Sequence, residues 1–495
     1  MIPLRMGTDA EFAALRSALV AAEYTGTAIC ARLGIAKITQ FDLDPERRPR
    51  RPPAARPDAL DVLIRLFLEG EAVPASEAAA LPIILLAALG LAAGDGETWS
   101  GTVLLSPMRG LYIASDRPYP LVKGSASAPD DFVYPAMIPN TDLFLDLIQP
   151  GPCAAFLDLC AGTGIAALLA AREGATHAYA FDITERSTAF AEFNRGLNGL
   201  TNASAAQGDL YQPAGELTFD RIVAHPPYVP VYRPHLIFDS GGQDGEQIVR
   251  RIVEGLPRYL RPGGLFFALT MGSDRGSDRE QPFERRLREW LGPQESEFDV
   301  AFVNRTTRTP REWAAESVIR NRGAVEDIAN WRAFFEGLHV NALVYGLVMI
   351  QRRSENLHGE TRPVFTVRRQ TGPRTGPGEH RWLLDWETAF MTRGLEWLLA
   401  ARPRAVPGIE LEVKHRLDTG NWEPRSYLLE TDHPFNTELR AQGWTAYLLA
   451  CADGSRTGAE LLEKLQGEGV LHPETPDAEF AEMLGTLCSG GFLQI

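Results

Sequence analysis

The stretch FLDLCAGTG at residues 156–164 constrains the fold of this chain more than any other. An apolar run ends at Asp158 and breaks into a turn with Gly162 and Gly164, which is typical of a buried parallel strand followed by a helix. Glycine has no Cβ, so the backbone of this turn can approach a bound group closely. The turn alone is a weak signal, because Ala167 replaces the last glycine of the dinucleotide-binding pattern.

The order of the following segments strengthens the prediction of an open α/β sheet. A second predicted strand, HAYAFDI, ends at Asp182, and after a helical stretch QGDL places Asp209 at a third strand end. A fourth strand runs into HPPY at 225–228. Ligands of such sheets bind at the carboxyl ends of the strands, so these residues are expected to gather around one site.

This order of glycine turn, acidic strand ends and Pro-Pro-Tyr resembles the class I S-adenosylmethionine-dependent methyltransferases. Within that family, the chain is most similar to the HemK-like release-factor glutamine methyltransferases and the small-domain ribosomal RNA methyltransferases. Two further passages carry the resemblance, MIPNTDLF at 137–144 and GGQDGEQIVRRIVEGLPRYLRPGGLF at 241–266.

The resemblance implies an α/β fold with a seven-stranded, mostly parallel Rossmann-like methyltransferase core at residues 130–353. Residues 1–129 are predicted to form an N-terminal helical or winged-helix-like domain, and 354–495 a C-terminal α+β domain for which a winged-helix-like form is one interpretation. The Pro- and Arg-rich stretch at 45–58 indicates a solvated linker, or an arm that contacts RNA or a partner. The Gly-, Pro-, Thr- and Arg-rich passage after Arg353 is predicted to be a loop or boundary.

S-Adenosylmethionine is the cofactor that the resemblance implies. Asp182 at the second strand end is expected to accept hydrogen bonds from the ribose hydroxyls. Asp209 and the backbone of Leu210 are expected to meet the adenine edge.

The methionine part of the cofactor is expected at the glycine turn. Asp158 either receives N–H groups of this turn or approaches the amino group of the cofactor. Gly162 and Gly164 allow the close approach, and Thr163 contributes its hydroxyl or its backbone. The other expected cofactor-binding residues are Thr141, Cys160, Ile183 and His225. Cys160 is interpreted as a small residue beside the cofactor and not as a nucleophile, because no basic residue is adjacent.

The HPPY segment supplies the predicted catalytic residues His225, Pro226 and Tyr228. In the family pattern, an Asn or Asp side chain and the carbonyl of the first proline accept hydrogen bonds from the substrate NH2 group, and the tyrosine stacks on the planar substrate. His225 replaces that amide here. A neutral imidazole has one donor and one acceptor nitrogen, so it accepts a single N–H.

Three hypotheses follow for His225. It orients an amide or amino nitrogen through one hydrogen bond, which leaves N-methylation in place. It acts as a general base for a hydroxyl or carboxyl acceptor. Or the acceptor site is lost and the domain binds the cofactor without turnover.

Composition limits the partners and the compartment. A formal charge of −15 argues against long, nonspecific contact with nucleic-acid backbone. No apolar run reaches the roughly 18 residues of a membrane helix. The five cysteines are scattered without metal-type spacing, so reduced thiols and no metal site are expected. These features favour a soluble cytoplasmic protein without a membrane partner.

The sequence thus predicts an S-adenosylmethionine-dependent methyltransferase that methylates nitrogen of a planar amide or amine in protein or nucleic acid. The acidic charge favours a protein or small-molecule acceptor. One alternative is an O-methyltransferase of a small molecule that uses His225 as base. The other is a non-catalytic adaptor that binds the cofactor.

Overall fold

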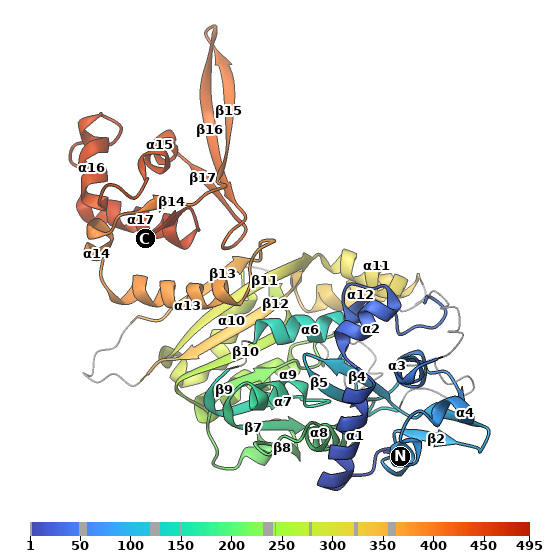
Figure 1. Ribbon diagram of the computed structural model, residues 1–495. Coiled ribbons are helices and arrows are strands. Elements are labelled where there is room, and N and C mark those ends of the chain that lie inside the picture. Colours follow the sequence, from blue (N-terminus) through green and yellow to red (C-terminus); the bar gives the residue numbers. More distant parts are fainter. Residues whose placement is uncertain are drawn as a thin grey trace. The chain divides into compact units, whose positions relative to one another are not determined.

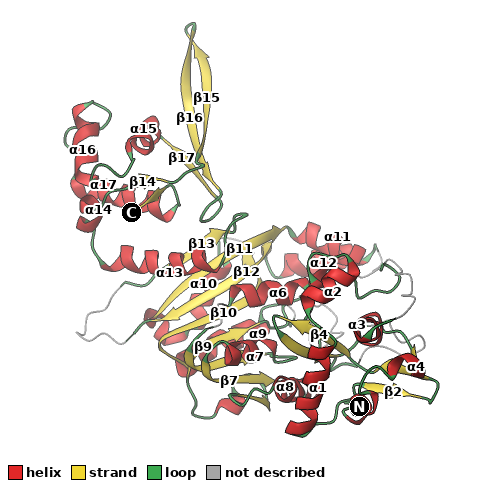
Figure 2. Ribbon diagram, in the orientation of Figure 1, coloured by secondary structure: helices red, strands yellow, loops and turns green. Residues whose placement is uncertain are grey.

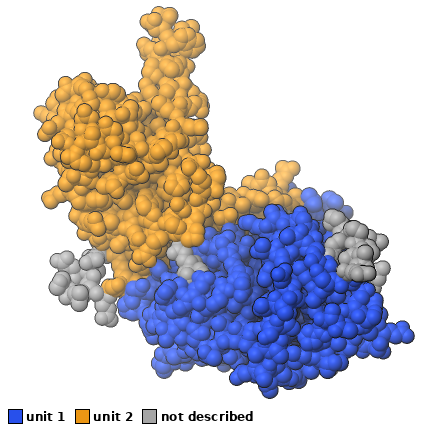
Figure 3. All heavy atoms as spheres, viewed as in Figure 1, with its two compact units in different colours: residues 1–272, 318–338 blue, residues 273–317, 339–495 orange. Residues whose placement is uncertain are grey.

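The computed structural model of the chain describes residues 2–48, 57–118, 129–148, 151–230, 241–242, 244–276, 280–320, 325–354 and 363–495. The chain divides into two compact units. The first comprises residues 1–272 and 318–338, and the second residues 273–317 and 339–495 (Figure 3).

Five parallel strands form the sheet of the first unit. They are β6 (Cys153–Leu159), β7 (Ala175–Asp182), β8 (Ala203–Gln207), β9 (Phe219–Ala224) and β10 (Leu260–Arg275). Their order is β10-β9-β6-β7-β8, and every neighbouring pair is parallel. The order reverses at β6, where the next strand in the chain, β7, lies on one side and β9 on the other. Such a reversal leaves a crevice at the carboxyl ends of the strands.

Helices connect these strands (Figure 1). They are α7 (Ile165–Arg172), α8 (Glu185–Asn198), the short η3 (Gln212–Ala214) and α9 (Gln247–Tyr259). The same unit contains α6 (Pro139–Leu147), which precedes β6, and α12 (Asp327–Gly337), which comes later in the chain. Helix α7 is apolar on all sides and buried over its first seven residues, Ile165 to Ala171. The α/β fold predicted from the sequence is therefore confirmed.

The N-terminal residues also belong to the first unit. They form short helices and two small sheets. The helices are α1 (Asp9–Ala21), α2 (Gly26–Leu33), η1 (Ile38–Gln40), α3 (Ala59–Leu63), η2 (Ile64–Glu69), α4 (Ala75–Ala78) and α5 (Ile83–Ala88). Strands β1 (Val73–Pro74), β2 (Ala92–Gly94) and β3 (Thr98–Gly101) form one sheet, and β4 (Leu104–Met108) and β5 (Leu111–Ser115) form a hairpin. Most of the Pro- and Arg-rich stretch, residues 49–56, lies outside the described residues.

Helix α8 fastens this N-terminal part to the sheet. The Asn194 side chain is fully buried, accepts the N–H of Ala114 at 2.8 Å, and donates to the carbonyls of Ala114 and Thr163, each at 3.0 Å. One turn later, Asn198 makes the same pair of bonds to Tyr112 on β5. Phe12 on α1 packs edge to face on Phe193, with ring centroids 5.2 Å apart. Asn194 thus joins the N-terminal hairpin to the glycine turn.

The second unit contributes three more strands, in the order β13-β11-β12. They are β11 (Phe298–Arg308), β12 (Val340–Arg352) and β13 (Thr366–Gln370), with α10 (Phe283–Trp290), η4 (Gly292–Glu297) and α11 (Pro310–Arg320) nearby in the chain. β11 pairs antiparallel with β12 and parallel with β13. The described residues therefore hold eight strands in the core sheet, one more than the seven predicted.

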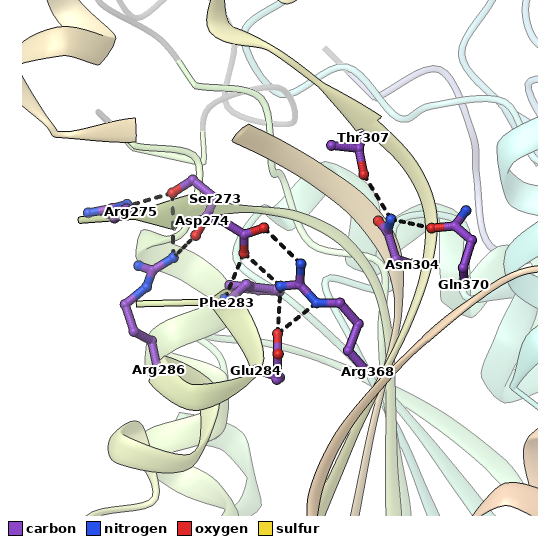
Figure 4. A network of polar contacts seen from close by, with 10 residues as sticks. All are labelled: Ser273, Asp274, Arg275, Phe283, Glu284, Arg286, Asn304, Thr307, Arg368 and Gln370. Carbon is purple, nitrogen blue, oxygen red and sulfur yellow. Dashed lines mark hydrogen bonds and ion pairs between the residues drawn. The ribbon is translucent and has the colours of Figure 1, made fainter. Parts of the chain in front are cut away.

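The extra strand β13 lies in the passage after Arg353 that was predicted to be a loop. The Arg368 guanidinium on β13 pairs with Asp274 at 2.6 Å and with Glu284 on α10 at 2.5 Å (Figure 4). On β11, Asn304 donates to Gln370 at 2.7 Å. The turn-rich composition of this passage does not indicate a strand. The strand is accommodated because carboxylates distant in the sequence neutralise its arginines.

The C-terminal residues build a separate core around α13 (Pro377–Thr392) and shorter helices. These are α14 (Glu396–Ala400), α15 (Gly443–Cys451), α16 (Gly458–Gly467) and α17 (Asp477–Ser489), with strands β14 (Arg404–Ala405), β15 (Glu410–Asp418), β16 (Asn421–Thr431), β17 (Thr437–Ala441) and β18 (Leu493–Gln494) (Figure 2). Leu448, Leu461, Leu465, Phe480 and Leu484 are fully buried in it. In the part of the chain that the structure describes, no helix is long and apolar enough to cross a membrane.

We expect Asn194→Ala to destabilise the protein by at least about 2 kcal/mol, because the substitution leaves buried backbone groups of Ala114 and Thr163 without partners. Urea unfolding followed by circular dichroism measures the shift in midpoint. Thr486→Ala, which removes a hydrogen bond on the exposed side of α17, is the control and should shift the midpoint little. Equal midpoints for Asn194→Ala and wild type would contradict the assigned role.

Candidate active site

A cavity of about 450 Å³ lies in the first unit at the carboxyl ends of β6, β7 and β9. Its volume falls within the roughly 300–1,000 Å³ typical of small-molecule sites. It is lined by all but one of the residues singled out in the sequence, namely Thr141, Asp158, Cys160, Gly162, Thr163, Asp182, Ile183, Asp209, Leu210, His225, Pro226 and Tyr228. The exception is Gly164.

The two glycines of the turn after β6 have different surroundings. Gly162 has a φ of +52°, and a Cβ added there would meet nothing within 4 Å, so its backbone borders open space. Gly164 has a φ of +76°, and an added Cβ would come within 2.9 Å of the Ala191 Cβ on α8. Gly164 was predicted to allow close approach to the cofactor; it does not line the cavity, and its missing Cβ makes room for Ala191 of α8.

Asp182 holds the glycine turn in place. Its carboxylate accepts the N–H of Gly162 at 2.9 Å through one oxygen and the N–H of Thr184 at 3.1 Å through the other. Asp182, and not Asp158, accepts the Gly162 N–H. The carboxylate also accepts from the Thr184 hydroxyl at 3.2 Å, and Asp182 borders the cavity, so its remaining acceptor capacity is available to a ligand.

Asp158 is the most deeply buried carboxyl group of the cavity wall, with 3 % of its surface exposed. Burial raises its pKa to about 8, against the lowering effect of a hydrogen bond from the Ala167 backbone, and the nearby charge of Asp182 raises the pKa further. At neutral pH this carboxyl group is therefore largely protonated. A cation that enters the cavity beside it would favour the ionised form.

The part of the cavity wall near Asp158 and Asp182 contains a further acidic residue and one arginine. Asp209 accepts from the Arg251 guanidinium of α9 at 2.7 Å, and both side chains border the cavity. Leu210 next to it has a φ of +52°. Burial and the neighbouring carboxylates raise the pKa of the Cys160 thiol well above its usual value, so this cysteine is not a thiolate nucleophile.

Three stacked rings, those of Phe144, His225 and Tyr228, form another part of the cavity wall. The His225 imidazole lies between Phe144 of α6, at 5.1 Å between ring centroids, and Tyr228, at 5.9 Å. Asn140, also on α6, donates to the Tyr228 hydroxyl at 3.3 Å. Burial lowers the pKa of His225 to about 4, so the ring is neutral at pH 7. A neutral ring held flat between two others presents its nitrogens at its edge.

Some lining residues were not assigned from the sequence. Phe144 and Asn140 lie in the passage MIPNTDLF, and Arg251 lies in the passage at 241–266; both passages were noticed, but no function was assigned to these side chains. Asp130 and Asp131 also line the cavity and add to its negative charge. Periodicity shows that α6 and α9 exist but not which of their side chains face a site formed by other segments.

Residues 129–290 match the model of the family "Methyltransferase small domain". A ribosomal protein uL3 glutamine methyltransferase of Bradyrhizobium diazoefficiens is 35% identical over 161 residues, which are 30% of this chain and 49% of that protein. A release factor glutamine methyltransferase of Moorella thermoacetica is 36% identical over 140 residues, 25% of this chain and 49% of that protein. A methyltransferase structure from Streptococcus mutans, described as putative, shares 15% identity over 50% of this chain and 56% of that one, with a TM-score of 0.29, too distant to carry weight.

Residues 129–290 thus match the small-domain methyltransferase family, and the relatives that this stretch resembles are glutamine methyltransferases. S-Adenosylmethionine is the cofactor of this class. The chain spans about half the length of the curated relatives that it matches.

We expect S-adenosylmethionine to release up to about one proton when it binds near pH 7, because its ammonium group favours the ionised form of Asp158. Titration calorimetry in two buffers of different ionisation enthalpy measures this proton. Asp158→Asn should abolish the release, and Asp209→Asn should keep it, since Asp209 is already paired with Arg251. An identical wild-type binding enthalpy in both buffers would exclude a protonated Asp158.

His225 should make the protein less stable as the pH falls from about 6.5 to about 4. In this range the unfolded chain binds a proton at residue 225 that the folded protein excludes, so unfolding is favoured. We expect His225→Asn to lose less stability than wild type between about pH 7 and pH 5, as measured by urea unfolding. Parallel pH profiles for the two proteins would argue against a buried, neutral imidazole.

Proposed function

We propose that this chain transfers the methyl group of S-adenosylmethionine to the nitrogen of a planar amide or amine in a protein. The supporting observation is that one cavity contains the glycine turn, the acidic strand ends and the HPPY segment. The first two suit a cationic donor and the third suits a planar acceptor. In-line transfer requires both reactants in one closed space, a few ångströms apart.

On the donor side, Asp182 would accept from the ribose hydroxyls and Asp209 with Leu210 would meet the adenine. Asp158 would face the ammonium group of the methionine part. The sulfonium and ammonium charges are opposite in sign to the carboxylates of the wall, which favours binding of the cation in a space shielded from water. Thr141, Cys160, Thr163 and Ile183 would complete the surface around the cofactor.

On the acceptor side, the carbonyl of Pro226 and one nitrogen of His225 would accept the two N–H groups of the acceptor, and Tyr228 would lie against its plane. This arrangement directs the nitrogen lone pair at the methyl carbon. As the new C–N bond forms, the C–S bond breaks and its electron pair neutralises the sulfonium. The nitrogen then loses a proton to solvent.

The pKa of His225 separates N-methylation from base-catalysed O-methylation. A general base is most effective when its pKa lies near the operating pH, whereas burial lowers the pKa of this imidazole to about 4. Such a ring is a weak base and is neutral throughout the physiological range. It suits orientation of an N–H better than removal of a proton from a hydroxyl.

A protein acceptor fits the charges better than a nucleic acid does. The chain carries a formal charge of −15, and Asp130 and Asp131 border the cavity, so a polyanion would be repelled. The relatives named above are a glutamine methyltransferase of a ribosomal protein and one of a release factor. We therefore propose a glutamine-like amide as acceptor and the cytoplasm as the place of reaction.

We expect His225→Asn to retain the rate of methyl transfer within about tenfold, because an amide oxygen also accepts an N–H. Tyr228→Ala should lower this rate about a hundredfold, because the acceptor is no longer held in line with the methyl group. Tyr228→Phe is the matched control: it keeps the ring that would lie against the acceptor, removes the hydroxyl that accepts from Asn140, and should stay active. The assay counts labelled methyl groups from S-adenosylmethionine in the protein, RNA and small-molecule fractions of a lysate of the source cell.

Two results would contradict this proposal. Loss of transfer in His225→Asn with activity kept in Tyr228→Ala would indicate base catalysis. Label in the RNA or small-molecule fraction, with none in protein, would replace the proposed acceptor.

A further inference from the structure

The hairpin of β15 and β16 has an open edge. Strand β15 pairs with β16 alone among the described residues, and β17 pairs only with Tyr427–Thr431 of β16 (Figure 1). The part of the hairpin that does not pair with β17 is exposed. The exposed fraction is 57 % for Leu417 and 68 % for Trp422. A nine-residue edge strand without proline exposes unpaired N–H and C=O groups along roughly 30 Å, and natural proteins usually cover or interrupt such edges.

The strand β15 is regular and two-faced. The bulge in the hairpin falls between Lys414 and His415, where the partner residue changes from Ser426 to Pro424, so the additional residue, Arg425, is on β16. Along β15, side chains alternate between faces. Glu410, Glu412, Lys414 and Arg416 share one face, and the Lys414 ammonium lies 3.5 Å from Glu412. Leu411, Val413, His415 and Leu417 share the other.

The charged face of β15 is complementary to itself. Two acidic residues precede Val413 and two basic residues follow it. If a second β15 pairs antiparallel with a two-fold axis at Val413, Glu410 lies opposite Arg416 and Glu412 opposite Lys414, and the symmetry makes each pair twice. Directly opposite side chains of unlike charge stabilise a sheet.

The neighbouring registers are less favourable. An axis at Lys414 keeps Glu412 opposite Arg416 but places two lysines opposite each other and Glu410 opposite Asp418. An axis at Glu412 keeps Glu410 opposite Lys414 but places two glutamates opposite each other. Like charges directly opposite are destabilising. Any other register that keeps the charged faces of both strands on one side of the sheet moves the two-fold axis by at least one residue. The pairing of opposite charges therefore favours the axis at Val413.

We propose that β15 is a homodimerisation edge, and that its partner is β15 of a second copy of this chain. The two three-stranded sheets then join into one, and the open edge of each hairpin is closed by main-chain hydrogen bonds. The apolar faces of both hairpins lie on the same side of the joined sheet, with Leu411 of one copy opposite His415 of the other.

Sedimentation velocity of the full-length chain over a concentration series tests this proposal. We expect wild type to form a dimer that weakens as salt increases, because the ion pairs are exposed and screened. K414E/R416E and E410K/E412K should each raise the dissociation constant at least about tenfold, since four attractive pairs become four repulsive ones. An equal mixture of the two variants should form a heterodimer with wild-type-like affinity.

Charge reversal on β17, which lies on the other side of β16 from β15, is the matched control: E438K/R440E should leave dimerisation unchanged. Circular dichroism spectra confirm that each variant is folded. A wild-type chain that stays monomeric to its solubility limit would overturn the proposal. So would a dimer that is unaffected by K414E/R416E, or the failure of the mixed variants to associate.

Discussion

The hydrogen bond from the Gly162 N–H to the Asp182 carboxylate is the contact on which the site depends, because it ties the turn after β6 to the end of β7. Two backbone bonds extend this link: Ala161 donates to the carbonyl of Phe181 at 3.1 Å, and Gly208 donates to the carbonyl of Asp182 at 2.9 Å. The ends of three adjacent strands thus meet at one residue. A crevice at the reversal of strand order becomes a cavity with fixed walls.

Limited access of water gives the cavity its chemical character. The same desolvation acts on an acid and on a base: it raises the pKa of Asp158 to about 8 and lowers the pKa of His225 to about 4. Both groups are therefore mainly neutral at pH 7. A cationic donor would restore the charge of Asp158, whereas the acceptor side remains uncharged and aromatic. In the proposed reaction, this difference between the two walls would orient the donor and the acceptor.

Support for the site comes from outside the strand ends. Asn194 bonds to Thr163 in the glycine turn and to Ala114 in the N-terminal hairpin, so the flanking residues brace the turn. Helix α6 provides Phe144 against His225 and Asn140 against Tyr228. Side chains that hold their neighbours in this way make a binding geometry precise by restricting its alternatives.

The sequence by itself determined the α/β class, the order of the strand ends and most of the cavity wall. This was possible because residues such as Asp158, Asp182 and Tyr228 lie at or shortly after the carboxyl ends of strands, and parallel strands bring these ends to one edge. It did not determine that Gly164 packs against Ala191, that β13 adds an eighth strand, or that Phe144 and Arg251 face the cavity. Only the tertiary structure decided these points, since each depends on a contact between segments far apart in the chain. The charge states of Asp158 and His225 were decided there as well, because a pKa follows from burial and neighbouring charges, which local sequence does not fix.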